Sequence, residues 1–511
     1  MSMRITNQMV TNNSLRNMQK SMSDVNTRTQ QMTSGKKISK ASEDPVTAIR
    51  ALKLRTTVNQ LEQYKDKNIL DARSWFSVTQ TSLDNITRRI KDINEYCVQG
   101  STDSFSTDDR SSIIDSLIQM KNMINDEGNA TYAGRYIFSG YKTDRSLAFS
   151  DTDDTTKYSY DIKQSFTSDD IDMRRVVTNE VDSTKVDGYI TDPTSYTQPA
   201  PKDVYRINLG YQNIDNINSE GTNVLSINAT KADGTAIDLS GFAITVKDTD
   251  DAATYHDVAD NGINVIKETG EIIFGVDVYN TIKQADSIDV EYAKNEFEAG
   301  ELRPEHYFDC TQRETQSDGS IRTVDYEFKK EGQPIYYEVN FNQSIQVNTE
   351  GNKLINSKIS NYIDDLIYTL RDLDEAEQTQ RNLEKMLKDS QYANNEDAVD
   401  RINQLLRDVD AEVAIKKETM QKTFSNNITN FQDYMDLITA TQSDLGSRMS
   451  KLEMIEIRVT EQYAEFKELK SKNEDVETDE ALINFKEANL VYESALAATG
   501  NIMRKSLLDY I

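Results

Sequence analysis

The glycines and prolines of this chain are concentrated in its middle, and this distribution limits the possible folds more than any other feature. Five of the six prolines lie between positions 193 and 334, and twelve of the 19 glycines lie between 145 and 351. Because glycine and proline interrupt helices and favour turns, long helices are possible only toward the two ends. At 511 residues the chain is long enough for several domains of ordinary size.

Apolar residues near the N-terminus recur with the alternating three- and four-residue spacing of a coiled coil. This first stripe consists of Leu15, Met18, Met22, Val25 and Met32. Gly35 is suited to end the helix, and Asp44 followed by Pro45 is a helix start signal. From Pro45 the apolar pattern runs to about Cys97, with one break after Leu61. A third helix is expected near residues 107–128.

The middle of the chain changes to the two-residue alternation that is typical of β-strands. The pattern is clearest around Val290, Val324 and Val339, and 13 of the 25 tyrosines lie between 145 and 350. Asp-Gly pairs at 187–188, 233–234 and 318–319 are typical of tight turns. We therefore predict one or two β-rich, sandwich-like domains in this region.

From about Leu354 the helical period returns and continues toward the C-terminus. The last helix, expected after Thr478, carries a second apolar stripe. That stripe consists of Phe485, Ala488, Tyr492, Ala495, Ile502 and Leu508. Neither terminal helix can bury its stripe alone, so we expect the two helices to pair with each other and with neighbouring copies. A monomeric coiled-coil protein with a globular insert is the alternative interpretation.

These patterns predict an α+β fold, with a long helical coiled-coil core built from both chain ends and an inserted β-rich outer region. Residues 1–44 would form an N-terminal assembly helix and loop, and residues 45–144 the first half of the core. Residues 145–350 would form the outer region, 351–475 the second half of the core, and 476–511 a C-terminal assembly helix.

The composition excludes most catalytic and metal chemistry. Lysine and arginine number 58 against 86 aspartates and glutamates, so the net charge of −28 disfavours nucleic acids and anionic membranes as partners. No apolar run is long enough to span a membrane. The chain has two histidines and two cysteines, so almost no residues are available for a zinc site or a Ser-His-Asp triad. We expect the two cysteines to be free thiols.

We expect no metal, no cofactor and no enzymatic activity, although a pair of carboxylates for glycoside hydrolysis stays possible among so many acids. The segment 303–310 gathers Glu305, His306, Asp309 and Cys310, and for it we expect a structural role. Trp75, the only tryptophan, lies near the apolar stripe of its helix and is expected to pack there.

Both ends of the sequence resemble the flagellin family of bacterial flagellar proteins, over about residues 1–144 and 440–511. The motifs that carry the resemblance are Met3-Arg4-Ile5-Thr6-Asn7, Ser34-Gly35-Lys36-Lys37-Ile38, Ser42-Glu43-Asp44-Pro45-Val46, Leu445-Gly446-Ser447-Arg448 and Ser506-Leu507-Leu508-Asp509-Tyr510-Ile511. The closing run is the most specific of these. It is more similar to family members at the hook–filament junction than to flagellin itself.

The resemblance implies an extracellular structural part of the flagellum, exported by the flagellar type III route without a cleaved signal peptide. It implies contacts with other copies in a ring, with hook-associated protein 1, with flagellin and with an export chaperone. It also implies that the terminal helices order on assembly. The expected interface residues are the two stripes together with Ile5, Leu507 and Tyr510. The alternatives are flagellin itself and a cytoplasmic coiled-coil scaffold.

Overall fold

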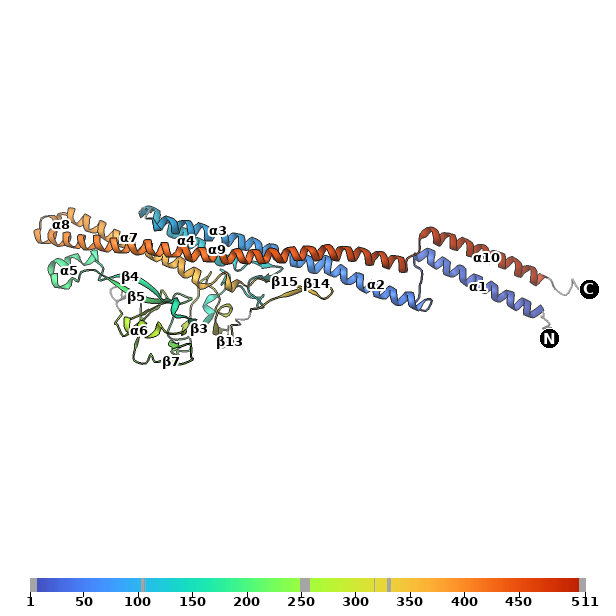
Figure 1. The fold of residues 1–511 in the computed structure, drawn as a ribbon, viewed down its shortest axis with the longest axis horizontal. Helices are drawn as coiled ribbons and strands as arrows, with labels where there is room; N and C mark the ends of the chain where they lie inside the picture. The colour runs from blue at the N-terminus through green and yellow to red at the C-terminus, as the bar shows by residue number, and fades with distance from the viewer. Residues whose placement is uncertain are drawn as a thin grey trace, which may run out of the picture. The chain divides into compact units, whose positions relative to one another are not determined.

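The computed structural model describes residues 7–102, 105, 107–248, 258–316, 318–328 and 332–504. The chain divides into two compact units (Figure 1). Unit 1 contains the residues up to Arg73, the segment Tyr337–Ile345 and the residues from Arg448 onward. Unit 2 contains Ser74–Tyr336 and Gln346–Ser447.

Unit 1 holds both terminal helices, α1 (Asn7–Ser34) and α10 (Thr478–Arg504), which lie side by side (Figure 1). Gly35 ends α1 with a φ of +66°, the left-handed conformation that favours glycine, as predicted. Helix α2 (Pro45–Gln63) begins where expected. Asp44 caps it, because one carboxylate oxygen accepts hydrogen bonds from the backbone N–H groups of Val46 and Thr47 at 3.1 and 3.2 Å.

A π-helical turn, η1 (Tyr64–Asn68), joins α2 to α3 (Ile69–Ser101). A π-turn places an extra residue in the helix and therefore rotates the face that follows it. This explains the break in the apolar pattern after Leu61. Beyond the turn, Trp75 is 1% exposed and packs edge-on against Tyr132 at 6.2 Å, so its expected packing role is confirmed.

The helices of unit 2 form a bundle that includes most of α3 and the part of α9 (Glu396–Glu474) up to Ser447. The others are α4 (Thr107–Glu127), α7 (Ser357–Lys388) and the short α8 (Ser390–Ala393). Ion pairs join α4 to α7: Arg110 contacts Asp374 at 2.6 Å, and Lys121 contacts Asp364 at 2.7 Å. The chain leaves this bundle near Phe138 and returns at Gly351, whose N–H donates to the Phe138 carbonyl at 2.8 Å.

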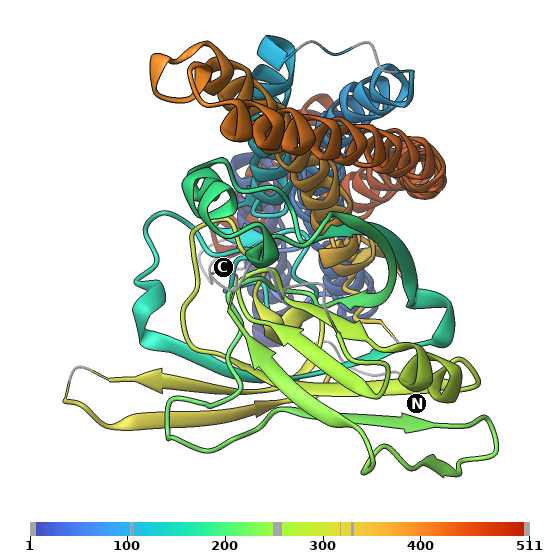
Figure 2. The same ribbon diagram turned by 90° about the vertical axis from the view of Figure 1, so that its left-hand side faces the viewer.

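The intervening region contains a five-stranded and a six-stranded sheet, which Figure 2 shows on one side of α7 and α9. The five-stranded sheet has the order β4 (Asp172–Thr178), β5 (Ala200–Asn208), β10 (Glu271–Phe274), β9 (Gly262–Ile266), β8 (Ala243–Lys247). The six-stranded sheet has the order β13 (Ile321–Tyr326), β12 (Asp309–Thr315), β3 (Tyr158–Phe166), β11 (Ser287–Lys294), β6 (Ser226–Thr230), β7 (Ala236–Ile237). Neighbours are antiparallel except β8 and β9.

Two-stranded ladders and short helices complete the fold. The ladders are β1 (Thr131–Tyr132) with β2 (Arg135–Tyr136), and β14 (Tyr336–Asn340) with β15 (Gln343–Gln346). The helices are α5 (Val186–Thr191) and α6 (Val276–Ile282). None of the helices in the described ranges is long and apolar enough to cross a membrane.

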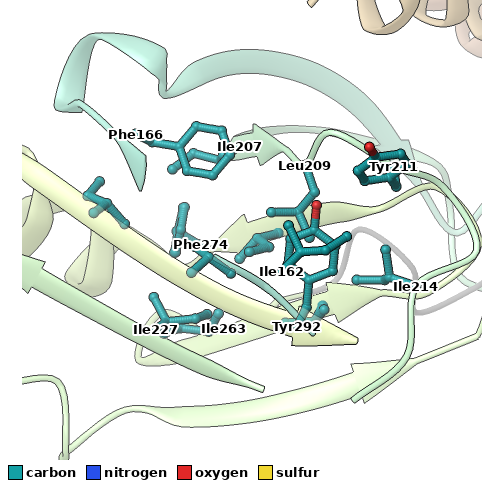
Figure 3. Close-up of a cluster of buried hydrophobic side chains, with 14 of the residues drawn as sticks. Ile162, Phe166, Ile207, Leu209, Tyr211, Ile214, Ile227, Ile263, Phe274 and Tyr292 are labelled. Atoms are coloured by element: carbon teal, nitrogen blue, oxygen red, sulfur yellow. The ribbon is translucent and has the colours of Figure 1, made fainter. Parts of the chain in front are cut away.

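The two sheets share one apolar core, so the sandwich-like prediction is confirmed. Ile207, Ile263 and Phe274 from the five-stranded sheet pack with Ile162 and Tyr292 from the six-stranded sheet (Figure 3). All five side chains are buried. The α+β fold class, with helices toward both chain ends and β structure between them, is confirmed as well.

One expected turn is a helix. Gly234 and Gly319 lie in turns with φ of +81° and +82°, as their Asp-Gly pairs predict, but Asp187-Gly188 lies inside α5. Tertiary packing overrides the local signal, because Val186 is buried in an apolar cluster with residues of α7 and α9. The Asp187 carboxylate also accepts a hydrogen bond from Tyr392 at 2.7 Å.

Candidate assembly surface

The inner face of the α1–α10 pair contains most of the predicted stripe residues. Leu15, Met18, Val25 and Met32 on α1 are half-buried, whereas Met22 is 51% exposed. On α10 the half-buried positions are Phe485, Ala488, Tyr492 and Ala495. The two stripes therefore face each other and shield one another only partly from solvent. Ile502 lies in the last turn of α10, while Ile5, Leu507, Leu508 and Tyr510 lie outside the described residues.

The solvent-exposed side of α10 is also apolar, a feature that was not predicted from the sequence. Ile483 and Leu490 are 64% and 65% exposed, and Leu482, Val491 and Leu496 are 42–53% exposed. Ile483 and Leu490 are seven residues apart. This heptad spacing, on the side of α10 away from the predicted stripe, was the feature of the sequence that could have revealed the exposed apolar side. A helix that is apolar on two faces and paired on only one has surface left for a further partner.

A polar joint ties the end of α9 to the middle of α2, and to the loop before α2, within unit 1. Glu474, whose side chain is 3% exposed, accepts two hydrogen bonds from the Arg55 guanidinium, at 2.6 and 2.7 Å. Lys36 pairs with Asp475, and the Lys37 N–H donates to the Glu474 carbonyl at 2.7 Å. The motif around Gly35 therefore connects the segments that precede α2 and α10.

Each buried or half-buried carboxylate of the joint is paired with a basic side chain. Hydrogen bonding to Arg55 lowers the pKa of Glu474, and hydrogen bonding to Lys36 lowers the pKa of Asp475. Both carboxylates therefore stay ionised over a wider pH range than free ones. The same contacts raise the pKa of Lys36.

The segment 303–310, for which a structural role was predicted, is largely buried and hydrogen-bonded. His306 is 7% exposed, and its Nε2 lies 3.0 Å from the Ser146 carbonyl. Glu305, 2% exposed, accepts a hydrogen bond from the Tyr160 hydroxyl at 2.9 Å. Both cysteines, Cys97 and Cys310, are free and buried. Within the described part of the chain no group of three or more His, Cys, Asp or Glu is arranged to hold a metal ion.

Residues 5–143, which include α1, α2, α3 and α4, match the family described as the bacterial flagellin N-terminal helical region. Over these residues the chain is similar to bacterial flagellins. The predicted family resemblance is thus confirmed for the N-terminal helices, which include α1 of the α1–α10 pair and Arg55 of the polar joint.

Two curated proteins similar to this chain are named flagellar hook-associated protein 3, from Escherichia coli (strain K12) and Salmonella typhimurium (strain LT2). Each is 30% identical over 143 residues, which cover 28% of this chain and 45% of the relative. The chain thus aligns with less than half the length of these relatives.

Solved structures of related proteins also match at low similarity. A putative flagellar hook-associated protein from Vibrio parahaemolyticus is 12% identical with a TM-score of 0.35, covering 85% of this chain and 100% of that one. The flagellar junction protein FlgL from Legionella pneumophila is 14% identical with a TM-score of 0.26, covering 80% of this chain and 99% of that one.

Proposed function

We propose that this protein is a structural subunit of the bacterial flagellum that joins the hook to the flagellin filament. The observation that carries the proposal is the 30% identity over 143 residues to two proteins named flagellar hook-associated protein 3. The doubly apolar helix α10 supports an assembly role, because a subunit that packs among copies needs a second buried face.

The mechanism is mechanical and involves no catalytic step. Ile483 and Leu490 would pack against the terminal helices of a neighbouring copy, and each fully buried side chain would contribute about 1.5–3 kcal/mol. Repeated around a ring, these contacts would build a tube that meets hook-associated protein 1 on one side and flagellin on the other. Ile5, Leu507, Leu508 and Tyr510 would extend the same surface.

The exposed apolar face of α10 would be a hazard before assembly, since exposed apolar patches promote aggregation. We propose that an export chaperone covers this face and that the subunit leaves through the flagellar type III export apparatus. In the finished flagellum the subunit would lie outside the cell.

The test is immunogold electron microscopy of the source cells, with an antibody against residues 145–300. One cluster of gold at the hook–filament junction is the expected result. Label along the entire filament would identify a flagellin instead. Label confined to the cell interior would reject both flagellar roles and favour a cytoplasmic scaffold.

A further inference from the structure

A cavity of about 880 Å³ lies in unit 2, between the strands β3, β4 and β5 on one side and the helices α7 and α9 on the other. Small-molecule sites usually have volumes of about 300–1,000 Å³, so this cavity has the size of a binding site. It contains none of the residues of the α1–α10 surface or of the polar joint.

The walls of the cavity are rich in neutral amides. Eight asparagine or glutamine side chains line it, six of which are Asn208, Asn352, Asn361, Asn426, Asn427 and Asn430. Serine and threonine hydroxyls and the rings of Phe308 and Tyr362 complete the lining. Amides both donate and accept hydrogen bonds, and the face of an aromatic ring attracts weakly positive C–H groups.

Several lining side chains have a buried polar atom with no hydrogen-bond partner among the described residues. Two are donors, Arg174 Nη2 and Arg206 Nε, and two are acceptors, Asn208 Oδ1 and Asn352 Oδ1. Arg174 and Arg206 are only 6% and 3% exposed. These four atoms have almost no accessible surface, so the hydrogen bonds to a ligand have to come from the accessible amides and hydroxyls of the wall.

The charges in the wall are balanced and largely paired with each other. Six basic side chains and five aspartates line the cavity of a chain whose net charge is −28. Arg206 pairs with Asp365 at 2.7 Å, and Lys358 pairs with Asp170 at 2.8 Å. Little positive charge is left for a phosphate or a carboxylate ligand, and a cation would meet the buried guanidinium groups.

We propose that this cavity binds a short, uncharged oligosaccharide. Each sugar hydroxyl is both a donor and an acceptor, as the amides and hydroxyls of the wall are, so one ligand can form several hydrogen bonds with the lining at once. The C–H face of a sugar ring fits against Phe308 or Tyr362. The proposal is independent of the flagellar role, because the cavity and the assembly surface share no residue.

Saturation-transfer NMR on the full-length protein tests the proposal with a panel of neutral trisaccharides: maltotriose, cellotriose, mannotriose and triacetylchitotriose. Trigalacturonate and inorganic phosphate serve as acidic comparisons. We expect transfer to at least one neutral member and none to the acidic probes. Failure of every neutral trisaccharide to bind, or binding of the acidic probes alone, would overturn the proposal.

Variants place the binding in the cavity. Asn208→Leu removes one of the lining amides and Thr423→Trp fills the space, so each should weaken binding about tenfold or more, equivalent to about 1.4 kcal/mol. Asn208→Leu should leave the melting temperature unchanged or higher, because it removes a buried unpartnered carbonyl. Asn228→Leu on the exposed face of β6 is the matched control and should bind normally.

Binding and melting temperature of the two cavity variants together distinguish a sugar site from a cavity without a ligand. Binding that survives both substitutions would place the sugar elsewhere and reject the site. If Asn208→Leu lowers the melting temperature, Asn208 has a structural role, and Thr423→Trp, on a half-buried position of α9, then decides whether the cavity binds the sugar.

Discussion

Glu474 shows how one residue can connect two segments that lie far apart in the sequence. Its carboxylate binds Arg55 through two hydrogen bonds while its carbonyl accepts the N–H of Lys37. A bidentate guanidinium–carboxylate contact fixes the orientation of the two side chains as well as the distance between them. The residue therefore holds the end of α9 against both α2 and the loop that precedes α2.

Glu474→Gln should lower the free energy of unfolding of unit 1 by about 1 kcal/mol, because it removes a charge-assisted contact whose partner Arg55 is half exposed. Amide hydrogen exchange in α1 and α10 would measure the loss as faster exchange. Glu468→Gln on the same helix, where the pair with Lys472 is mostly exposed, should change nothing. Equal effects of the two substitutions would argue against a special role for the joint.

His306 makes the stability of unit 2 depend on pH. Burial lowers the pKa of His306 to about 4, so the folded state keeps the ring neutral while the unfolded chain takes up a proton below about pH 6.5. The unfolded state then binds more protons, and stability falls as the pH drops from 6.5 toward 4. We expect a loss of about 2 kcal/mol between pH 7 and pH 5 from this residue.

Urea unfolding of the wild type and of His306→Gln over that pH range measures this contribution. Glutamine can still donate to the Ser146 carbonyl but does not titrate, so the variant should lose less stability as the pH falls. Parallel pH profiles for the two proteins would show that His306 is not the titrating group.

Among the elements, α10 differs from the other terminal helix in having two apolar faces. The face toward α1 is half-buried, and the opposite face is largely exposed. Substitutions on these two faces should therefore have separate effects on folding and on assembly.

The double substitution Ile483→Ser with Leu490→Ser should leave the helix content and melting of the single chain nearly unchanged, because both residues are exposed. It should abolish incorporation into flagella, since about 3–6 kcal/mol of apolar burial would be lost per contact. Motility and immunogold labelling measure incorporation. Lys486→Ser with Glu493→Ser, at exposed polar positions of the same helix, is the control, and a similar defect in both variants would contradict the assigned face.

Much of the element structure could be predicted because its signals are local. The heptad spacing from Leu15 to Met32, the cap at Asp44 and the alternation around Val290 each depend on neighbours in the sequence. The π-turn at Tyr64–Asn68 left only a gap in the pattern, and α5 was misread because its packing partners lie about 200 residues away. The strand order, the Arg55–Glu474 joint and the cavity depend on such distant contacts and left no local signal.

At the scale of the molecule, the terminal helices and the sandwich differ in how much surface they bury. No described side chain of α1 is fully buried, whereas the sandwich core contains more than twenty buried apolar residues. Regions with few buried contacts open at low free-energy cost. The terminal pair should therefore be the least stable part of an isolated subunit.

Limited trypsin digestion should cut α1 and α10 well before it degrades unit 2. Arg16, Lys20 and Lys486 offer cleavage sites on exposed positions of these helices. We expect a trimmed product that keeps the sandwich, identified by intact mass spectrometry and by an unchanged high-temperature melting transition. Simultaneous loss of all regions would show that the chain unfolds as one unit.

The hydrogen bond between Gly351 and Phe138 has a consequence for how such proteins can change over evolution. Because the chain departs from the helical bundle and rejoins it at one point, the stretch between these residues can grow, shrink or be exchanged without stretching the helices around it. The family match also ends at residue 143, just beyond this point. Related lineages can therefore share the helical scaffold and still carry different outer modules, and foreign domains could be grafted here.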